Sequence, residues 1–258
     1  MGYNGRDGPV AHEPLTVLAA LGWGSFAAGS LVLGALLAFA RPWSDLQVGL
    51  VLAFGAGALI SAVSFELADE GIAAGGLGWT AAGLAAGALT YWALDGVIAG
   101  RAASGRGRGG RKEGSNAGTA LALGAFLDGV PEQVVLGIGI ASGNGVGASL
   151  LVAIFVSNLP EAIGSARDMH AAGTSRSRIL RLWGGVAIVC AAATVIGYLA
   201  AEAATGEIRA VIDGFAAGAL LVMLIDSMIP EARAGAGRVA GLATTFGFAV
   251  AAALSSLS

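Results

Sequence analysis

The sequence predicts an all-α, polytopic integral membrane protein with eight transmembrane helices. Of its 258 residues, 56% are hydrophobic and only 12% are charged, and the mean hydropathy is +0.78. Soluble domains carry about 25% charged residues, so this composition excludes an ordinary water-soluble domain. Eight apolar stretches approach the roughly 20 residues that a spanning helix needs. They cover residues 15–40, 47–67, 77–98, 117–140, 147–166, 182–204, 210–230 and 238–257.

The basic residues alternate with the predicted spans. Twelve of the fourteen Lys and Arg residues lie in the connections after the first, third, fifth and seventh spans, and only Arg6 and Arg209 lie on the other side. Basic residues accumulate in cytoplasmic connections. The pattern therefore predicts a multi-pass protein of the cell (plasma) membrane with both termini outside the cytoplasm.

The longest connection, residues 101–116, is rich in Gly, Ser and Arg. Such a segment cannot bury a core, so we expect a flexible cytoplasmic loop within a single transmembrane domain, 1–258. We interpret its basic residues as a solvated topology signal rather than a contact to nucleic acid or acidic lipid. Asp213, near the start of the seventh span, is expected to be solvated.

Acidic and helix-breaking residues interrupt the fourth span, which reads FLDGVPEQVV over 126–135. Asp128 lies at the centre of the span, and Glu132 follows about 6 Å further along the axis on the same face. A carboxylate at this depth costs roughly 2.5–3.5 kcal/mol, so both must face the bundle interior, water, a proton or a cation. Pro131 leaves a backbone carbonyl unpaired. Together these groups form an array of hard oxygen ligands.

Other spans repeat the order of a polar residue, two further residues, then Pro-Glu. In the fifth span (FVSNLPEAIG) and the seventh (LIDSMIPEA), these residues are Ser157, Pro160, Glu161, Ser227, Pro230 and Glu231. The second span ends SFELADEG, with Glu66, Asp69 and Glu70. The chain has only six prolines, so three Pro-Glu pairs at helix-breaking sites form a fairly specific signal. Glu66, Asp69, Glu70 and Glu231 are interpreted either as an entry or exit path or as acidic helix ends.

Two halves of the chain resemble each other. FGAGAL from Phe54 in the second span matches FAAGAL from Phe215 in the seventh, and the same register places Glu70 opposite Glu231. The topology makes these spans antiparallel. Matched segments of opposite orientation predict an inverted repeat, in which spans 1–3 correspond to spans 6–8 around a central pair. Secondary transporters are commonly built this way, with broken helices that hold a site near the midplane.

With these motifs, the chain resembles the ZIP family of divalent metal permeases along essentially its whole length. That family carries His-Asn-x-Pro-Glu-Gly-like and Gln/His-Asn/Asp-x-Pro-Glu-like motifs in its fourth and fifth spans. The resemblance implies a metal site shared by these spans with an acid of the seventh nearby, alternating access, and a homodimer. It also implies movement of a divalent cation towards the cytoplasm, with zinc first and manganese or iron next.

Carried over by position, the resemblance implies six metal-ligating residues. These are Asp128, Glu132, Ser157, Asn158, Glu161 and Asp226. Asp128 stands where the family has histidine, and Ser157 stands where it has histidine or glutamine. No histidine lies in any predicted span, so we expect an all-oxygen site that holds one metal. Oxygen ligands move the preference from zinc towards harder ions such as manganese.

Two alternatives stay open. The carboxylates could exchange protons in a carrier of another solute, or the chain could be a non-transporting ZIP relative that lacks the metal-binding histidines. An enzyme is not expected, because the sequence has no HExxH, no GxSxG and no nucleophile with a base. We expect no cofactor. The expected partners are the transported divalent cation and the lipid bilayer, and no nucleic acid.

Overall fold

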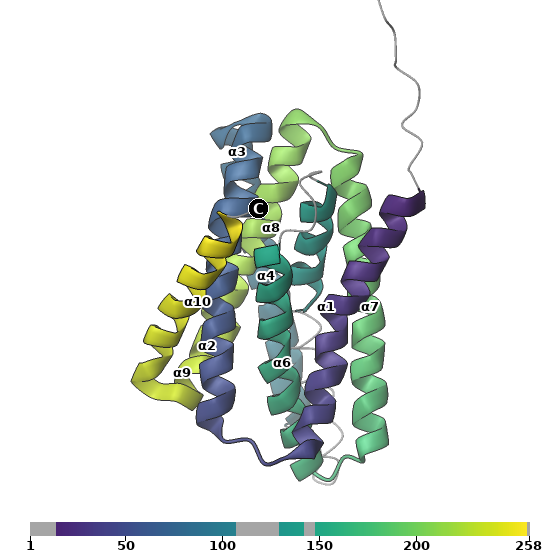
Figure 1. The fold of residues 1–258 in the computed structure, drawn as a ribbon, viewed down its shortest axis with the longest axis vertical. Coiled ribbons are helices and arrows are strands. Elements are labelled where there is room, and N and C mark those ends of the chain that lie inside the picture. The colour runs from purple at the N-terminus through teal and green to yellow at the C-terminus, as the bar shows by residue number, and fades with distance from the viewer. Residues whose placement is uncertain (1–13, 107–128, 142–147, 257–258) are drawn as a thin grey trace, which may run out of the picture.

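A computed structural model describes residues 14–106, 129–141 and 148–256, which form long helices with short connections (Figure 1). The helices are α1 (Pro14–Ala40), α2 (Asp45–Ala62), α3 (Asp69–Gly75), α4 (Leu77–Arg106), α6 (Ala148–Ala171), α7 (Arg176–Glu202), α8 (Gly206–Met223), α9 (Ile229–Ala236) and α10 (Ala240–Ser255). Another helix, Gly129–Ala141, precedes α6. These residues contain no strand, so the all-helical prediction is confirmed over the described ranges.

Short non-α segments join some of these helices. The π-helical turns η1 (Val63–Ala68) and η2 (Leu224–Met228) connect α2 to α3 and α8 to α9, and the 3-10 turn η3 (Gly237–Val239) precedes α10. At its start, α2 is capped by Ser44, whose side chain accepts a hydrogen bond from the Gln47 backbone. The helix α4 extends to Arg106, so residues 101–106 of the predicted flexible loop are helical, and the rest of that loop lies outside the described residues.

Five helical stretches of the described chain are long and apolar enough to cross a membrane. They are Val17–Ala40, Asp45–Gly75, Leu150–Ala171, Arg176–Glu202 and Gly206–Ser255. The last stretch holds α8, α9 and α10, which cover the seventh and eighth predicted spans. The third predicted span is helical within α4 but is not among the five, and the fourth is represented by the shorter apolar helix Gly129–Ala141. These helices are consistent with a membrane protein.

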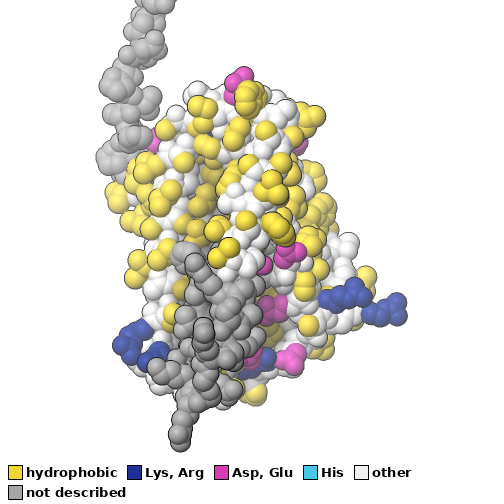
Figure 2. All heavy atoms as spheres, turned by 180° about the vertical axis from the view of Figure 1, so that it is seen from behind, with side chains coloured by type: hydrophobic (Ala, Val, Ile, Leu, Met, Phe, Trp, Pro, Cys, Tyr) yellow, Lys and Arg dark blue, Asp and Glu magenta, His cyan; other side chains and the backbone are white. Residues whose placement is uncertain are grey.

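The connections alternate between the two ends of the molecule. The α1–α2, α6–α7 and α9–α10 connections lie at the bottom of Figure 1, and the α3–α4 and α7–α8 connections lie at the top. We call these the α1–α2 end and the α7–α8 end. On the face shown in Figure 2, the Lys and Arg side chains lie in the lower part of the view, and apolar side chains cover the upper part.

The helices pack in two bundles. In the first bundle, α1 contacts α6 and α7, and Gly129–Ala141 lies against α7. The second bundle pairs α4 with α8, α2 with α9 and α10, and α3 with α8. The two bundles contact each other along α2 and α6. Each bundle therefore contains helices that are far apart in the sequence, as Figure 1 shows for α1 and α7.

Glycine permits the closest helix contacts. A Cβ atom added to Gly57 of α2 would collide with the backbone of Thr244 in α10, and one added to Gly218 of α8 would collide with the backbone of Leu84 in α4. Small residues let the backbones of membrane helices approach each other closely. The resulting van der Waals packing drives helix association in lipid, where there is no hydrophobic driving force between helices. The abundance of glycine in the sequence thus has a packing reason in the second bundle.

Gly57→Ala is expected to lower the melting temperature of the detergent-purified protein by several degrees. Its methyl group would press against the backbone of α10, and overpacking of this kind costs about 1–3 kcal/mol. Gly29→Ala in α1 is the matched control, because no atom lies within 4 Å of its added Cβ. That control should be neutral or stabilising, since alanine is the better helix former. An unchanged melting temperature for Gly57→Ala would contradict the described packing.

Candidate functional site

A buried polar cluster lies where Gly129–Ala141 faces α6. The hydroxyl Oγ of Ser157 lies 3.1 and 3.2 Å from the two carboxylate oxygens of Glu132 and donates to that carboxylate. Glu132 is 2% exposed, and Ser157 is fully buried. Behind Ser157, α2 approaches so closely that a Cβ on Gly55 would lie 2.8 Å from the Ser157 Cα atom. Two residues predicted from separate spans are therefore in direct contact.

Asn158, the residue after Ser157 in α6, is a further buried polar side chain. Its side chain is fully buried, and neither the amide nitrogen nor the amide oxygen has a hydrogen-bond partner within the described residues. Buried polar groups are nearly always hydrogen-bonded, and leaving one unsatisfied costs about 1–3 kcal/mol. Both ends of this amide are thus available to a ligand, and its oxygen is of the kind that hard cations bind.

A second buried polar pair, Gln133 and Thr194, joins Gly129–Ala141 to α7. The hydroxyl of Thr194 donates to the Gln133 amide oxygen at 2.6 Å, and both side chains are fully buried. Gly137 and Gly197 let the two helices approach at this level. Sequence reasoning missed this pair. The signal that could have found it is a glutamine directly after Glu132 inside an apolar span.

Glu161 follows Ser157 by one turn of α6 and is partly buried. The sulfur atom of Cys190 in α7 would lie 3.1 Å from a Cβ on Gly129, at the start of the described helix that carries Glu132.

The other two predicted ligands have different outcomes. Asp128 lies outside the described residues, and the side chain of Asp226 is exposed on η2. Within the described ranges, no three side chains of His, Cys, Asp or Glu come close enough together to hold a metal ion. The part of the site that the structure describes therefore consists of Glu132, Ser157 and Asn158, with Glu161 one turn away.

The predicted helix-breaking residues occupy three different environments. Pro160 lies inside α6, which continues as an α-helix to Ala171, and Pro131 lies in the first turn of the described helix Gly129–Ala141. Pro230 follows the π turn η2 at the start of α9. Asp69 holds the matching place at the start of α3, after η1. Because η1 forms without a proline, a π turn rather than proline interrupts α-helical geometry in these two spans.

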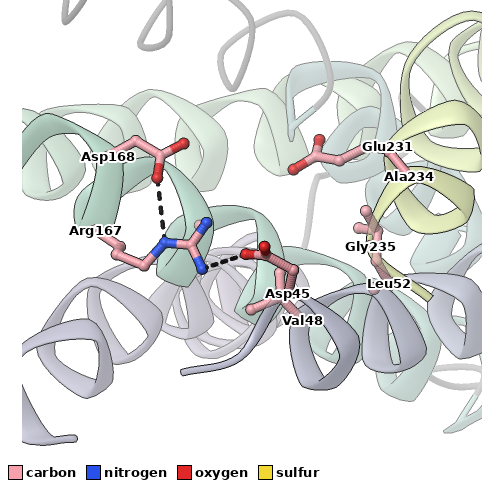
Figure 3. Close-up of a pocket in the computed structure, with 10 residues that line it drawn as sticks. Asp45, Val48, Leu52, Arg167, Asp168, Glu231, Ala234 and Gly235 are labelled. Carbon is pink, nitrogen blue, oxygen red and sulfur yellow. Dashed lines mark hydrogen bonds and ion pairs between the residues drawn. The ribbon is translucent and has the colours of Figure 1, made fainter. Parts of the chain in front are cut away.

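A pocket of about 280 Å³ lies between the two bundles at the α1–α2 end (Figure 3). It is lined by Asp45, Val48, Gly49 and Leu52 of α2, by Gly164, Arg167 and Asp168 of α6, and by Glu231, Ala234 and Gly235 of α9. Figure 3 shows the Glu231 carboxylate pointing into this space. A Cβ on Gly164 would lie 3.7 Å from that carboxylate. Gly164 is three residues beyond Glu161, so the pocket adjoins the α6 face that carries the buried cluster.

At the α7–α8 end, Arg209 binds the acids that follow the second span and begin the seventh. Its Nε atom lies 2.9 and 3.0 Å from the two carboxylate oxygens of Asp213, and Nη2 lies 3.5 Å from Glu70. Asp213 is fully buried, so the expectation that it is solvated was wrong. Burial of this carboxylate is tolerated because the guanidinium pairs with it. Of the other acids, Glu66 is partly buried and Asp69 is exposed.

No protein-family model matches the chain, and no curated protein is similar to it in sequence. Its function is therefore argued from the buried cluster, the pocket and the arrangement of the helices.

Ser157→Ala is expected to lower the free energy of unfolding by about 1–3 kcal/mol, because it removes a donor from the buried Glu132 carboxylate. Ser165→Ala, on the same helix, is the matched control. The Ser165 hydroxyl is buried without a hydrogen-bond partner in the described chain, so its removal should be neutral or stabilising. Unfolding in detergent, followed by circular dichroism, measures both. Equal effects of the two substitutions would show that the Ser157–Glu132 contact contributes nothing.

Proposed function

We propose that this chain is a membrane permease that moves a divalent metal cation towards the cytoplasm, as its resemblance to the ZIP family implies. The observation that carries the proposal is the buried, unpartnered amide of Asn158, which follows in the α6 sequence the Ser157 that donates to Glu132. A cation bound by Glu132 and the Asn158 oxygen would satisfy both groups and offset the cost of burying the carboxylate. Asp128, one turn before Glu132 in the sequence, is proposed as a further ligand.

The proposed topology is eight spans in an inverted repeat of three, two and three. Two parts of the structure support it. The register that aligns Phe54 with Phe215 also aligns η1 with η2, since Val63 and Leu224 each begin a π turn nine residues later. The glycine contacts repeat as well: Gly57 meets Thr244 while Gly247 meets Phe54, and Gly218 meets Leu84 while Gly87 meets Phe215. The α2–α10 and α8–α4 contacts thus share one pattern.

The pocket at the α1–α2 end is proposed as the cytoplasmic exit. Most basic residues belong to the connections at this end, which supports its cytoplasmic location in a plasma membrane. Glu161 lies between the buried cluster and the pocket along α6, and Glu231 lies at the pocket itself. Carboxylates at successive levels would let a cation leave in short steps, each with partial rehydration.

Zinc is the first cargo to test because of the ZIP resemblance, and manganese and iron(II) come next. The side chains proposed to bind the cation offer only oxygen atoms as ligands, which suits manganese better than zinc. These side chains are Glu132, Ser157, Asn158 and Glu161. A carrier that uses the same carboxylates for protons would bind none of these ions.

A non-transporting ZIP relative is the second candidate function. It is favoured by the finding that the described residues hold no group of three His, Cys, Asp or Glu side chains suited to a metal. Thermal unfolding with and without each ion separates the two, because a ligand that binds only the folded state stabilises it by about 2.7 kcal/mol at one hundred times its Kd. No shift with zinc, manganese or iron(II) would favour the non-transporting relative.

Glu132→Gln and Glu161→Gln are each expected to reduce divalent-cation uptake at least tenfold, because the amide keeps the shape of the side chain and removes its negative charge. Uptake is measured in proteoliposomes loaded with a metal-sensitive dye, separately for zinc, manganese and iron(II). Glu207→Gln, at an exposed acid in the first turn of α8, is the matched control and should leave uptake unchanged. Full uptake by both site variants, with folded protein recovered equally, would rule out this site.

A further inference from the structure

Two arginines join the bundles, one near each end of the molecule. We propose that Arg209 and Arg167 act as locks between the bundles, and that the unequal burial of the two locks keeps the α7–α8 end closed and leaves the α1–α2 end as the one that opens first. The purpose of such locks rests on the proposed permease function. The effect of the two locks on access to the pocket can be measured whether or not the protein transports an ion.

The Arg209 lock belongs to the second bundle and reaches into the first. Asp213 and Glu70 hold the guanidinium on its own side. Its remaining N–H groups cross to the first bundle, where Nη2 lies 3.1 Å from the Ile138 carbonyl and Nη1 lies 3.4 Å from the Ala201 carbonyl. The side chain of Arg209 is only 12% exposed. One buried side chain thus ties α8 and α3 to α7 and Gly129–Ala141.

One of the carbonyl groups that Arg209 binds lies at a helix end. The helix α7 ends at Glu202, one residue after Ala201, and the last carbonyls of a helix carry the negative end of its dipole. A cation is therefore favoured at this position. The Asp213–Arg209 pair lies within α8, so separating the bundles here would break the contacts of Arg209 with Ile138 and Ala201 and leave buried N–H groups without these acceptors.

The Arg167 lock runs in the opposite direction. Arg167 belongs to α6 of the first bundle, and its Nη1 atom lies 2.7 Å from Asp45 at the start of α2 and 3.3 Å from the Trp43 carbonyl. Its Nε atom lies 3.1 Å from Asp168 on its own helix. The side chains of Arg167 and Asp45 are 37% and 74% exposed. Figure 3 shows this pair at one side of the pocket, opposite Glu231.

The two locks differ in strength for a physical reason. Exposed ion pairs gain little, because water and salt screen them, whereas a buried charged donor that loses its hydrogen-bond acceptors carries the full cost of its desolvation. The Arg167 lock therefore opens easily, and the Arg209 lock does not. A pocket is present between the bundles at the Arg167 end, as expected if the weaker lock guards the side that opens first. Opening the other end requires Arg209 to release Ile138 and Ala201.

A cysteine reporter in the pocket tests the proposal without any transported ion. Cys190 is the only cysteine of the chain and is buried, so Cys190→Ala provides a cysteine-free parent. Gly164→Cys then places a thiol in the pocket, where the nearest atoms to its Cβ lie at 3.7 Å. The rate of labelling by a hydrophilic maleimide is measured in lipid nanodiscs. The melting temperature of each variant is measured alongside.

Arg209→Gln is expected to slow labelling of the reporter at least threefold, because release of the α7–α8 end allows the bundles to close over the pocket. Arg167→Gln is expected to accelerate labelling at least threefold. The swap of Asp45→Arg with Arg167→Asp should restore the parent rate. Arg238→Gln, at an exposed arginine in η3, is the matched control and should label at the parent rate.

Unchanged or faster labelling in Arg209→Gln would overturn the proposal. If that variant does not fold, Arg209→Lys and Glu70→Gln take its place, since each keeps part of the lock and should slow labelling to a smaller extent. Metal uptake by the same variants is measured separately. Altered labelling without any uptake would support the locks and reject the permease, whereas uptake with unaltered labelling would reject the locks and keep the permease.

Discussion

The buried carboxylate of Glu132 sets the requirements that the surrounding helices must meet. A carboxylate inside an apolar bundle needs a hydrogen-bond donor or a cation. Ser157 supplies the donor from α6, and α6 can bring it there because α2 packs against its back at Gly55. Thr194 fixes the neighbouring Gln133 from α7. The helices α6, α2 and α7 are therefore positioned around the helix that carries Glu132.

The polar side chains divide between two tasks. Those of the buried cluster leave capacity unused, as the unpartnered amide of Asn158 shows. Those around Arg209 are paired with acids and backbone carbonyls drawn from both bundles. An unsaturated group favours binding of a ligand, and a saturated one favours a rigid contact. The same residue types, carboxylates above all, thus occur both in the buried cluster and in the contacts of Arg209.

Much of the fold could be predicted from composition and motif spacing. Five described helical stretches are as long and apolar as the sequence predicted for membrane spans, and the repeat of polar residue and Pro-Glu led to Glu132 and Ser157. The prediction that Asp213 is solvated was wrong, because it rested only on the position of Asp213 near a span end. Arg209, one turn earlier on the same buried face, pairs with this carboxylate. The Thr194–Gln133 bond was missed because its partners are far apart in the sequence. The π turn η1 was missed because no proline marks it.

The sequence by itself determined that the chain is helical and apolar enough for a membrane. It also showed acidic residues inside predicted spans, where burial of a carboxylate costs free energy. These properties follow from local quantities: hydropathy over about 20 residues, helix periodicity and the missing N–H of proline. The tertiary structure decided which polar groups meet. Ser157 reaches Glu132, Asp226 is exposed, and Arg209 crosses between the bundles. Such pairings depend on helix rotation and on the contacts that each glycine allows, and neither is encoded within a single span.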